Sequence, residues 1–167
     1  AVVESGAVDA FEASVEELAI MCGSHRGHPE QVAVVRRLLQ RLDLPPSALV
    51  CGSLEHPCSG KHAGMLMLAR HLGAPTEGYE KVEHPAQEEV ARTIRSLLAR
   101  FSGWPRGTSG PETASSGGSL FCGVDGCGVP VVRVTLYEAG CLYALLGAGA
   151  TPGLARTRRF ASRFSSM

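Results

Sequence analysis

The stretch Cys58-Ser59-Gly60-Lys61-His62-Ala63-Gly64 decides how this sequence is interpreted, because it leads from a turn-rich segment directly into an apolar one. We expect a helix from Lys61 to about Leu72, ended by Gly73. Cys58 and Lys61 then point toward one face at the helix start, where the free N-terminus is expected to lower the pKa of the Cys58 thiol. The alternative is a glycine-rich helix entry that encloses a buried cysteine.

A second stretch, Gly123-Val124-Asp125-Gly126-Cys127-Gly128-Val129-Pro130, follows much later in the chain. Its alternating glycines allow close backbone approach and predict a tight turn that presents Asp125 and Cys127 on one side. A plain glycine-rich turn, in which Asp125 only accepts backbone hydrogen bonds, explains the same residues. The sequence of this stretch alone leaves both interpretations open.

Helical patterns precede the first stretch. Ser14 and Glu17 form a capping-box signature, and apolar residues follow at helical spacing through Cys22. Residues 23–28 are expected to form a loop, and Pro29 suits the first position of a second helix. The apolar face of that helix consists of Val32, Val35, Leu38, Leu39 and Leu42.

Further elements are expected after the first stretch. A helix is predicted to start near Pro85, with one apolar face formed by Val90, Ile94, Leu97, Leu98 and Phe101. The Ser/Gly-rich residues 102–119 are interpreted as a flexible insertion. A strand is expected over 129–136 and a helix over 137–146, and the basic tail 154–167 is expected to fray.

Composition excludes several classes of protein. The 167 residues are 44% hydrophobic and 19% charged, with a formal net charge of zero, which opposes a dedicated nucleic-acid binder. No apolar run approaches the roughly 20 residues of a membrane span. A chain of this length does not need disulfide staples, so its six cysteines favour thiols or metal-bound thiolates in a reducing compartment, with the cytoplasm as the default. A homodimer is compatible with these features.

Reactive residue types gather in three loops. In the loop Cys22-Gly23-Ser24-His25 a serine flanked by glycine can expose its hydroxyl beside a histidine, although a turn or helix-end serine is the better explanation of this loop alone. The cysteine spacing permits zinc, and one alternative is a structural site formed by Cys51, Cys58, Cys122 and Cys127. A thiol-redox module is a further alternative.

These loops resemble the asparaginase II family, the bacterial-type, zinc-containing Ser-Lys L-asparaginases. The resemblance rests on Val3-Glu4-Ser5-Gly6-Ala7, on Glu17-Leu18-Ala19-Ile20-Met21-Cys22-Gly23-Ser24-His25 and on the two stretches quoted above, which follow one another in this order along the chain. It covers roughly residues 1–135, and it makes residues 1–153 a partial domain of this family. The implied fold is an α/β sandwich related to serine β-lactamases and glutaminases, with helices packed on a sheet.

The resemblance implies hydrolysis of L-asparagine to aspartate and ammonia. It places the catalytic serine at Ser24 and the zinc ligands at Cys58, Lys61 and Cys127. It places His25, His62 and Asp125 around the substrate and the metal. A lysine ligand must be neutral, so the metal would have to depress the pKa of Lys61.

The chain also departs from the family pattern. The lysines that partner the family's serines fall upstream and downstream of this chain, whose own lysines are Lys61 and Lys81. His56-Pro57 replaces the asparagines that commonly precede the first stretch. We therefore expect a chain that is incomplete at both ends, or divergent, and the alternative function is a catalytically inactive zinc-binding remnant.

Overall fold

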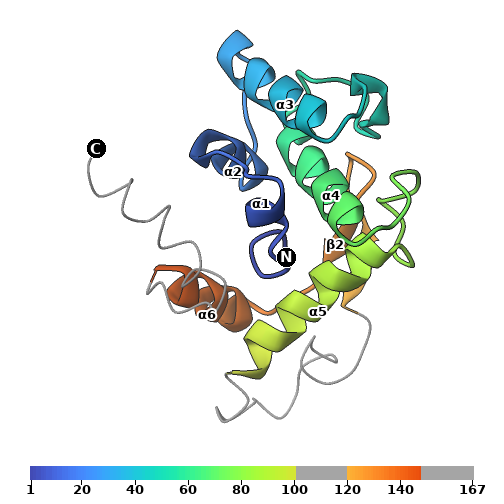
Figure 1. Ribbon diagram of the computed structural model, residues 1–167. Helices are drawn as coiled ribbons and strands as arrows, with labels where there is room; N and C mark the ends of the chain where they lie inside the picture. The colour runs from blue at the N-terminus through green and yellow to red at the C-terminus, as the bar shows by residue number, and fades with distance from the viewer. Residues whose placement is uncertain (101–119, 148–167) are drawn as a thin grey trace.

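The computed structural model describes residues 1–100 and 120–147 (Figure 1). The elements in these ranges are α1 (Ala7–Ala10), α2 (Val15–Met21), α3 (Pro29–Arg41), the 3-10 helix η1 (Pro46–Ala48), α4 (Ser59–His71), α5 (Pro85–Ala99), β1 (Phe121–Val124), β2 (Pro130–Val132) and α6 (Leu136–Gly147). The insertion predicted at 102–119 and the tail predicted at 154–167 lie outside the described residues, as does Phe101.

Helix α4 is the centre of the fold. Ten of its 13 residues are buried, and α1, α2, α3 and α5 pack around it (Figure 1). A helix that is buried on nearly all sides has no polar face, which explains its continuous apolar sequence. The helix begins at Ser59, two residues before the predicted start, and Gly73 beyond its end has a φ of +66°.

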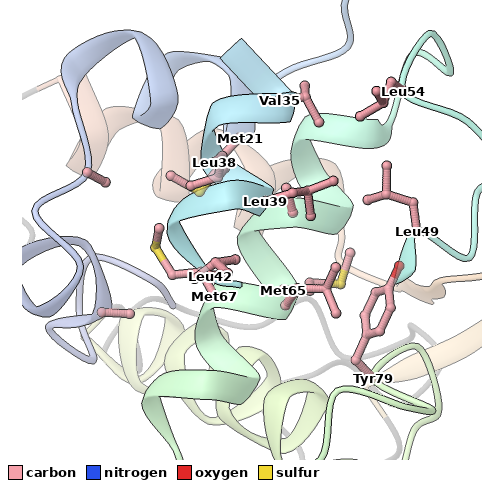
Figure 2. Close-up of a cluster of buried hydrophobic side chains, with 14 of the residues drawn as sticks. Met21, Val35, Leu38, Leu39, Leu42, Leu49, Leu54, Met65, Met67 and Tyr79 are labelled. Atoms are coloured by element: carbon pink, nitrogen blue, oxygen red, sulfur yellow. The ribbon is translucent and has the colours of Figure 1, made fainter. Parts of the chain in front are cut away.

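Helices α2 and α3 confirm the patterns predicted for them. In α2 the Ser14 side chain accepts from the Glu17 backbone N–H, and the Glu17 carboxylate accepts from the Ser14 N–H, which completes the capping box. Helix α3 starts at Pro29 and buries Val35, Leu38 and Leu39. Figure 2 shows these side chains in the cluster formed with Met65 and Met67 of α4.

Two glycines allow α2 to approach α4 closely. A Cβ on Gly60 would overlap the backbone carbonyl oxygen of Ile20, and one on Gly64 would lie 2.9 Å from the Met21 sulfur. The glycines of the first stretch are therefore packing residues, and they bring the end of α2 against the start of α4.

The only sheet within the described ranges is a hairpin. Strands β1 and β2 pair antiparallel, with Phe121 opposite Val132 and Val124 opposite Pro130. The predicted strand over 129–136 is shorter than expected, because α6 begins at Leu136 behind a capping box of Thr135 and Glu138. Sequence did not indicate β1, since its short, glycine-containing segment becomes a strand only by pairing with β2.

The architecture is a mixture of helices and a small sheet, which agrees with the α/β class at that level. A layered sandwich of the β-lactamase type does not appear in the described residues, because strands of four and three residues form a ribbon and not a layer. No helix in the same part of the chain has the length and apolarity to cross a membrane.

Candidate metal centre and serine loop

The first half of the site is the N-terminal end of α4. Cys58 is the N-cap residue, and its backbone N–H donates to His56 Nδ1 at 3.1 Å. The expected low thiol pKa is not found: burial raises the pKa of Cys58, and the opposing charge of Lys61 does not overcome it. Desolvation therefore outweighs the charge of Lys61 at this position.

The second half is the turn between β1 and β2. The Asp125 backbone N–H donates to the Val129 carbonyl at 2.8 Å, and the Gly128 N–H donates to the Asp125 carbonyl at 2.9 Å. Gly128 has a φ of +89°, and a Cβ there would lie 3.3 Å from Val50. The turn thus buries Cys127 against the residues before α4 and leaves Asp125 exposed.

The two halves of the site meet and bring together Cys58 and Cys127, two of the residues that the family resemblance implied as zinc ligands. Ligand atoms of Cys58, Asp125 and Cys127 all lie within 4.8 Å of one another. Asp125 Oδ2 is 3.4 Å from Cys127 Sγ and 3.3 Å from Lys61 Nζ. The hydrogen bond from the Gly126 N–H, followed by those from Cys127 and Lys61, lowers the pKa of Asp125.

Lys61 lies in this group as a cation. Burial opposes its charge, but hydrogen bonds to Cys127 and Asp125 outweigh burial and raise the pKa of Lys61. Its ammonium is therefore an ion-pair partner of Asp125 in this geometry. Service as a metal ligand would require loss of that proton, since only a neutral amine has a free lone pair.

His62 lies beneath the group and is fully buried. The Tyr79 hydroxyl accepts from the Val50 N–H at 3.0 Å and lies 2.6 Å from His62 Nδ1, and the direction of the second bond depends on the tautomer of the His62 ring. His62 Nε2 has no hydrogen-bond partner of good geometry within the described residues, although an interaction with the Cys127 backbone slightly favours the charged ring. Burial lowers the pKa of His62 to about 4, with smaller effects from Lys61 and His56, so the ring is neutral.

His25 lies at the junction of the serine loop with α4. It is 5% exposed, and its Nε2 is 2.7 Å from Ser59 Oγ. Its Nδ1 accepts from the Gly27 N–H at 3.1 Å. Burial, followed by the charge of His56, lowers the pKa of His25 and favours the neutral ring.

Ser24 is exposed in the loop just before His25. Among the described residues its hydroxyl has no hydrogen-bond partner. The structure therefore places the predicted nucleophile on an accessible loop beside the start of α4, without a contact to Lys61 or Asp125.

Sequence reasoning missed Tyr79 and Ser59. Tyr79 is fully buried and links His62 to Val50, while Ser59 links His25 to the Leu54 carbonyl. Ser59 lies within the first quoted stretch and Tyr79 lies outside the quoted segments, and a hydroxyl carries no sequence signal of its partner. Spatial proximity alone identifies them.

The alternative four-cysteine site is not assembled in the described structure. Cys122 is exposed on β1, and the Cys51 thiol lies 3.8 Å from the Ser53 carbonyl oxygen. The group able to hold a metal contains Cys58, Asp125 and Cys127. All six cysteines are free thiols.

Comparison with known proteins gives a single family. The family model described as L-asparaginase II matches residues 1–167, which is the whole chain and extends beyond the predicted 1–135. A search of curated proteins finds no match.

Proposed function

This chain belongs to the L-asparaginase II family, and we propose that it is an amidohydrolase that converts L-asparagine and water to aspartate and ammonia. The observation that carries this proposal is the meeting of the two predicted stretches in one group of side chains. Lys61 and Asp125, 64 residues apart in sequence, are in direct contact. Cys58 and Cys127 come from the same two stretches and lie beside that pair.

The donor set fits zinc. Two thiolates bound to tetrahedral zinc at about 2.3 Å lie about 3.8 Å apart, and the three donor atoms already lie within 4.8 Å of one another. Cys58 and Cys127 would supply two thiolate ligands, and Asp125 or a deprotonated Lys61 would be the third protein ligand. When bound, zinc would supply Lewis acidity toward a substrate carbonyl.

Ser24 is the proposed nucleophile. Its oxygen would attack the side-chain amide carbon of asparagine, and its proton would pass to the departing ammonia as the C–N bond breaks. Water would then cleave the resulting ester and restore the serine. The exposed position of Ser24 leaves its hydroxyl accessible to a substrate in solution.

Ammonia release from L-asparagine tests the activity. We expect release by the wild-type chain and loss of at least about 100-fold in Ser24→Ala, as for removal of a covalent nucleophile. Turnover that Ser24→Ala does not slow would refute the nucleophile assignment.

Metal analysis tests the ligand set. About one zinc per chain is expected, lost in Cys127→Ser and retained in Cys122→Ser, whose exposed thiol lies outside the group. Comparison of Lys61→Ala with Asp125→Asn identifies the third ligand, because the variant that loses zinc lacks it. Zinc retained in Cys58→Ser and Cys127→Ser would refute the site.

A second candidate is a zinc-binding family member without turnover. The lysine count favours this candidate. Lys61 pairs with Asp125. The only other lysine in the sequence, Lys81, is exposed, and its aliphatic carbons lie beside Gly78. A Ser-Lys mechanism needs a lysine as general base. Zinc binding without ammonia release would identify this candidate.

We also propose that the hairpin belongs to the sheet of a β-lactamase-like sandwich, an assignment that rests on the family resemblance. The free thiols support a reducing compartment such as the cytoplasm. An experimental structure containing residues 101–119 and 148–167 would test the sandwich by its strand order.

A further inference from the structure

A network of four hydrogen bonds includes two that connect the serine loop to the start of α4, one within the loop and one from Ser59 to the segment before α4. The His25 backbone N–H donates to the Pro57 carbonyl at 3.1 Å. The Gly27 N–H donates to His25 Nδ1, and His25 Nε2 contacts Ser59 Oγ. Ser59 Oγ in turn donates to the Leu54 carbonyl at 2.8 Å.

The donor and acceptor roles in this network are determined by the backbone groups at its two ends, the Gly27 N–H and the Leu54 carbonyl. Nδ1 accepts a backbone N–H, so in the neutral ring Nε2 carries the proton and donates it to Ser59 Oγ. The Ser59 hydroxyl can then donate to a carbonyl, which it does at Leu54. Both ring nitrogens of His25 and the Ser59 hydroxyl are satisfied, and Ser59 is fully buried.

Close backbone contacts hold both sides of the same loop. Gly27 has a φ of +72°, and a Cβ there would lie 3.0 Å from the Glu55 carbonyl oxygen. On the other side, Gly60 admits the Ile20 carbonyl at the end of α2. Both ends of the loop therefore lie in close backbone contact with the segment around Cys58, which directly precedes Ser59.

We propose that His25 is a positioning residue: bridging Gly27 and Ser59, it fixes Ser24 relative to the Cys58 end of α4 and couples the serine loop to metal binding. Its role in catalysis rests on the proposed function of Ser24. Its role as a bridge rests on the hydrogen bonds alone. A ring whose two nitrogens are both engaged inside the protein is not available to bind substrate directly.

Amide hydrogen exchange tests the bridge without reference to activity. In Ser59→Ala, exchange at the His25 and Gly27 amides should rise about tenfold, as expected when one buried hydrogen bond is lost. Zinc should slow exchange at these two amides in the wild-type chain and not in Ser59→Ala. Unchanged exchange in Ser59→Ala, or zinc without effect in the wild type, would overturn the proposal.

A double-mutant cycle between His25 and Ser59 tests whether the two residues form one bridge. His25→Asn keeps an acceptor near Gly27 and loses the contact to Ser59, so combining it with Ser59→Ala should add little to either single change. Fully additive effects would contradict a shared bridge. His71→Asn is the matched control, because His71 contacts the Ser5 carbonyl away from this loop. If Ser59→Ala does not fold, amide exchange at Gly27 in His25→Asn tests the bridge in its place.

Kinetics then test the link to catalysis. In His25→Asn we expect kcat for asparagine to fall about 100-fold, with a smaller change in KM and unchanged zinc content, because a misplaced nucleophile slows the chemical step. A rise in KM with kcat unchanged would instead make His25 a substrate contact and refute the positioning role. If the wild-type chain releases no ammonia, the proposed function fails, while the exchange results still decide the bridge.

Discussion

The helical body, residues 1–99, and the C-terminal unit, residues 120–147, differ in how they bury apolar side chains. In the body, Leu38, Leu66 and Leu68 are completely or almost completely buried. In the C-terminal unit, Val124, Tyr143 and Leu136 are 71%, 75% and 91% exposed. Yet both regions contribute residues to the candidate metal centre.

The difference shows how the C-terminal unit is held in place. Cys127 and Val129, in and beside its turn, pack into the core of the body, and Leu120 packs with Ala91 and Leu98 of α5. The unit therefore depends on the body's core more than on its own. A metal bound by Cys58 and Cys127 would add a direct link between the two regions.

The largest contrast is expected from truncating one leucine in each region. Leu66→Ala should lower the free energy of unfolding by about 2–5 kcal/mol, because it leaves a cavity in a fully buried site. Leu142→Ala, in the half-buried face of α6, should cost about 1 kcal/mol. Urea denaturation measures both, and equal losses would show that the unit has a core as tight as that of the body.

The same change at two helical glycines should have opposite signs. Gly60→Ala should destabilise by about 1–3 kcal/mol, since its methyl group meets the Ile20 backbone. Gly140→Ala has open space around it and should stabilise α6 by about 0.5–1 kcal/mol. Thermal unfolding of both variants checks this, and a neutral Gly60→Ala would mean that α2 and α4 are less closely packed.

Removing a tyrosine hydroxyl should lower the free energy of unfolding when the tyrosine lies in the body and leave it nearly unchanged when the tyrosine lies in the C-terminal unit. Tyr79→Phe leaves the Val50 N–H and His62 Nδ1 without a partner and should cost about 1–3 kcal/mol. Tyr143→Phe, on an exposed side chain, should change stability by less than about 0.5 kcal/mol. If denaturant titration gives both variants wild-type stability, the buried hydroxyl is replaced by water or by a shift of the ring.

The smallest change in stability is expected from an ion pair on α5, the helix of the body that contacts α6 of the C-terminal unit. Glu89 accepts from Arg92 Nε at 2.6 Å, and this bond, opposed by burial, lowers the pKa of Glu89. A lowered folded-state pKa contributes stability above the unfolded value near 4.5, and that contribution is lost as pH falls through the folded value.

Glu89→Gln should therefore cost about 0.5 kcal/mol at pH 7, because Arg92 is largely exposed. The difference from wild type should vanish well below pH 4.5. Stability measured across this range checks the sign, and a difference that grew as the solution became more acidic would contradict it.

Sequence patterns predicted the body better than the unit. The capping box of α2, the proline start of α3 and the start of α5 near Pro85 were all confirmed. These signals are local, because each depends on residues within a few positions of one another. Strand β1 was missed, since its partner across the turn and not its own sequence makes it a strand.

The candidate site follows the same division. The family resemblance carried by the two stretches implied that their cysteines, lysine and aspartate belong to one site, and the structure brings these side chains together. Sequence did not indicate the raised pKa of Cys58, the pairing of Lys61 with Asp125 or the buried link from His62 to Tyr79. The burial of these side chains and the distances between them determine these properties, and a short segment of sequence specifies neither.

The sequence by itself determined the positions of the longer helices, the family and the residue types available for chemistry, because these depend on local patterns and on side-chain identity. The tertiary structure decided which of those residues meet. It placed Asp125 against Lys61 and His25 against Ser59, since packing of α2 on α4 and of the β1–β2 turn on the segment before α4 brings distant parts of the chain together. Close packing requires interlocking shapes, so these contacts arise only when the whole fold forms.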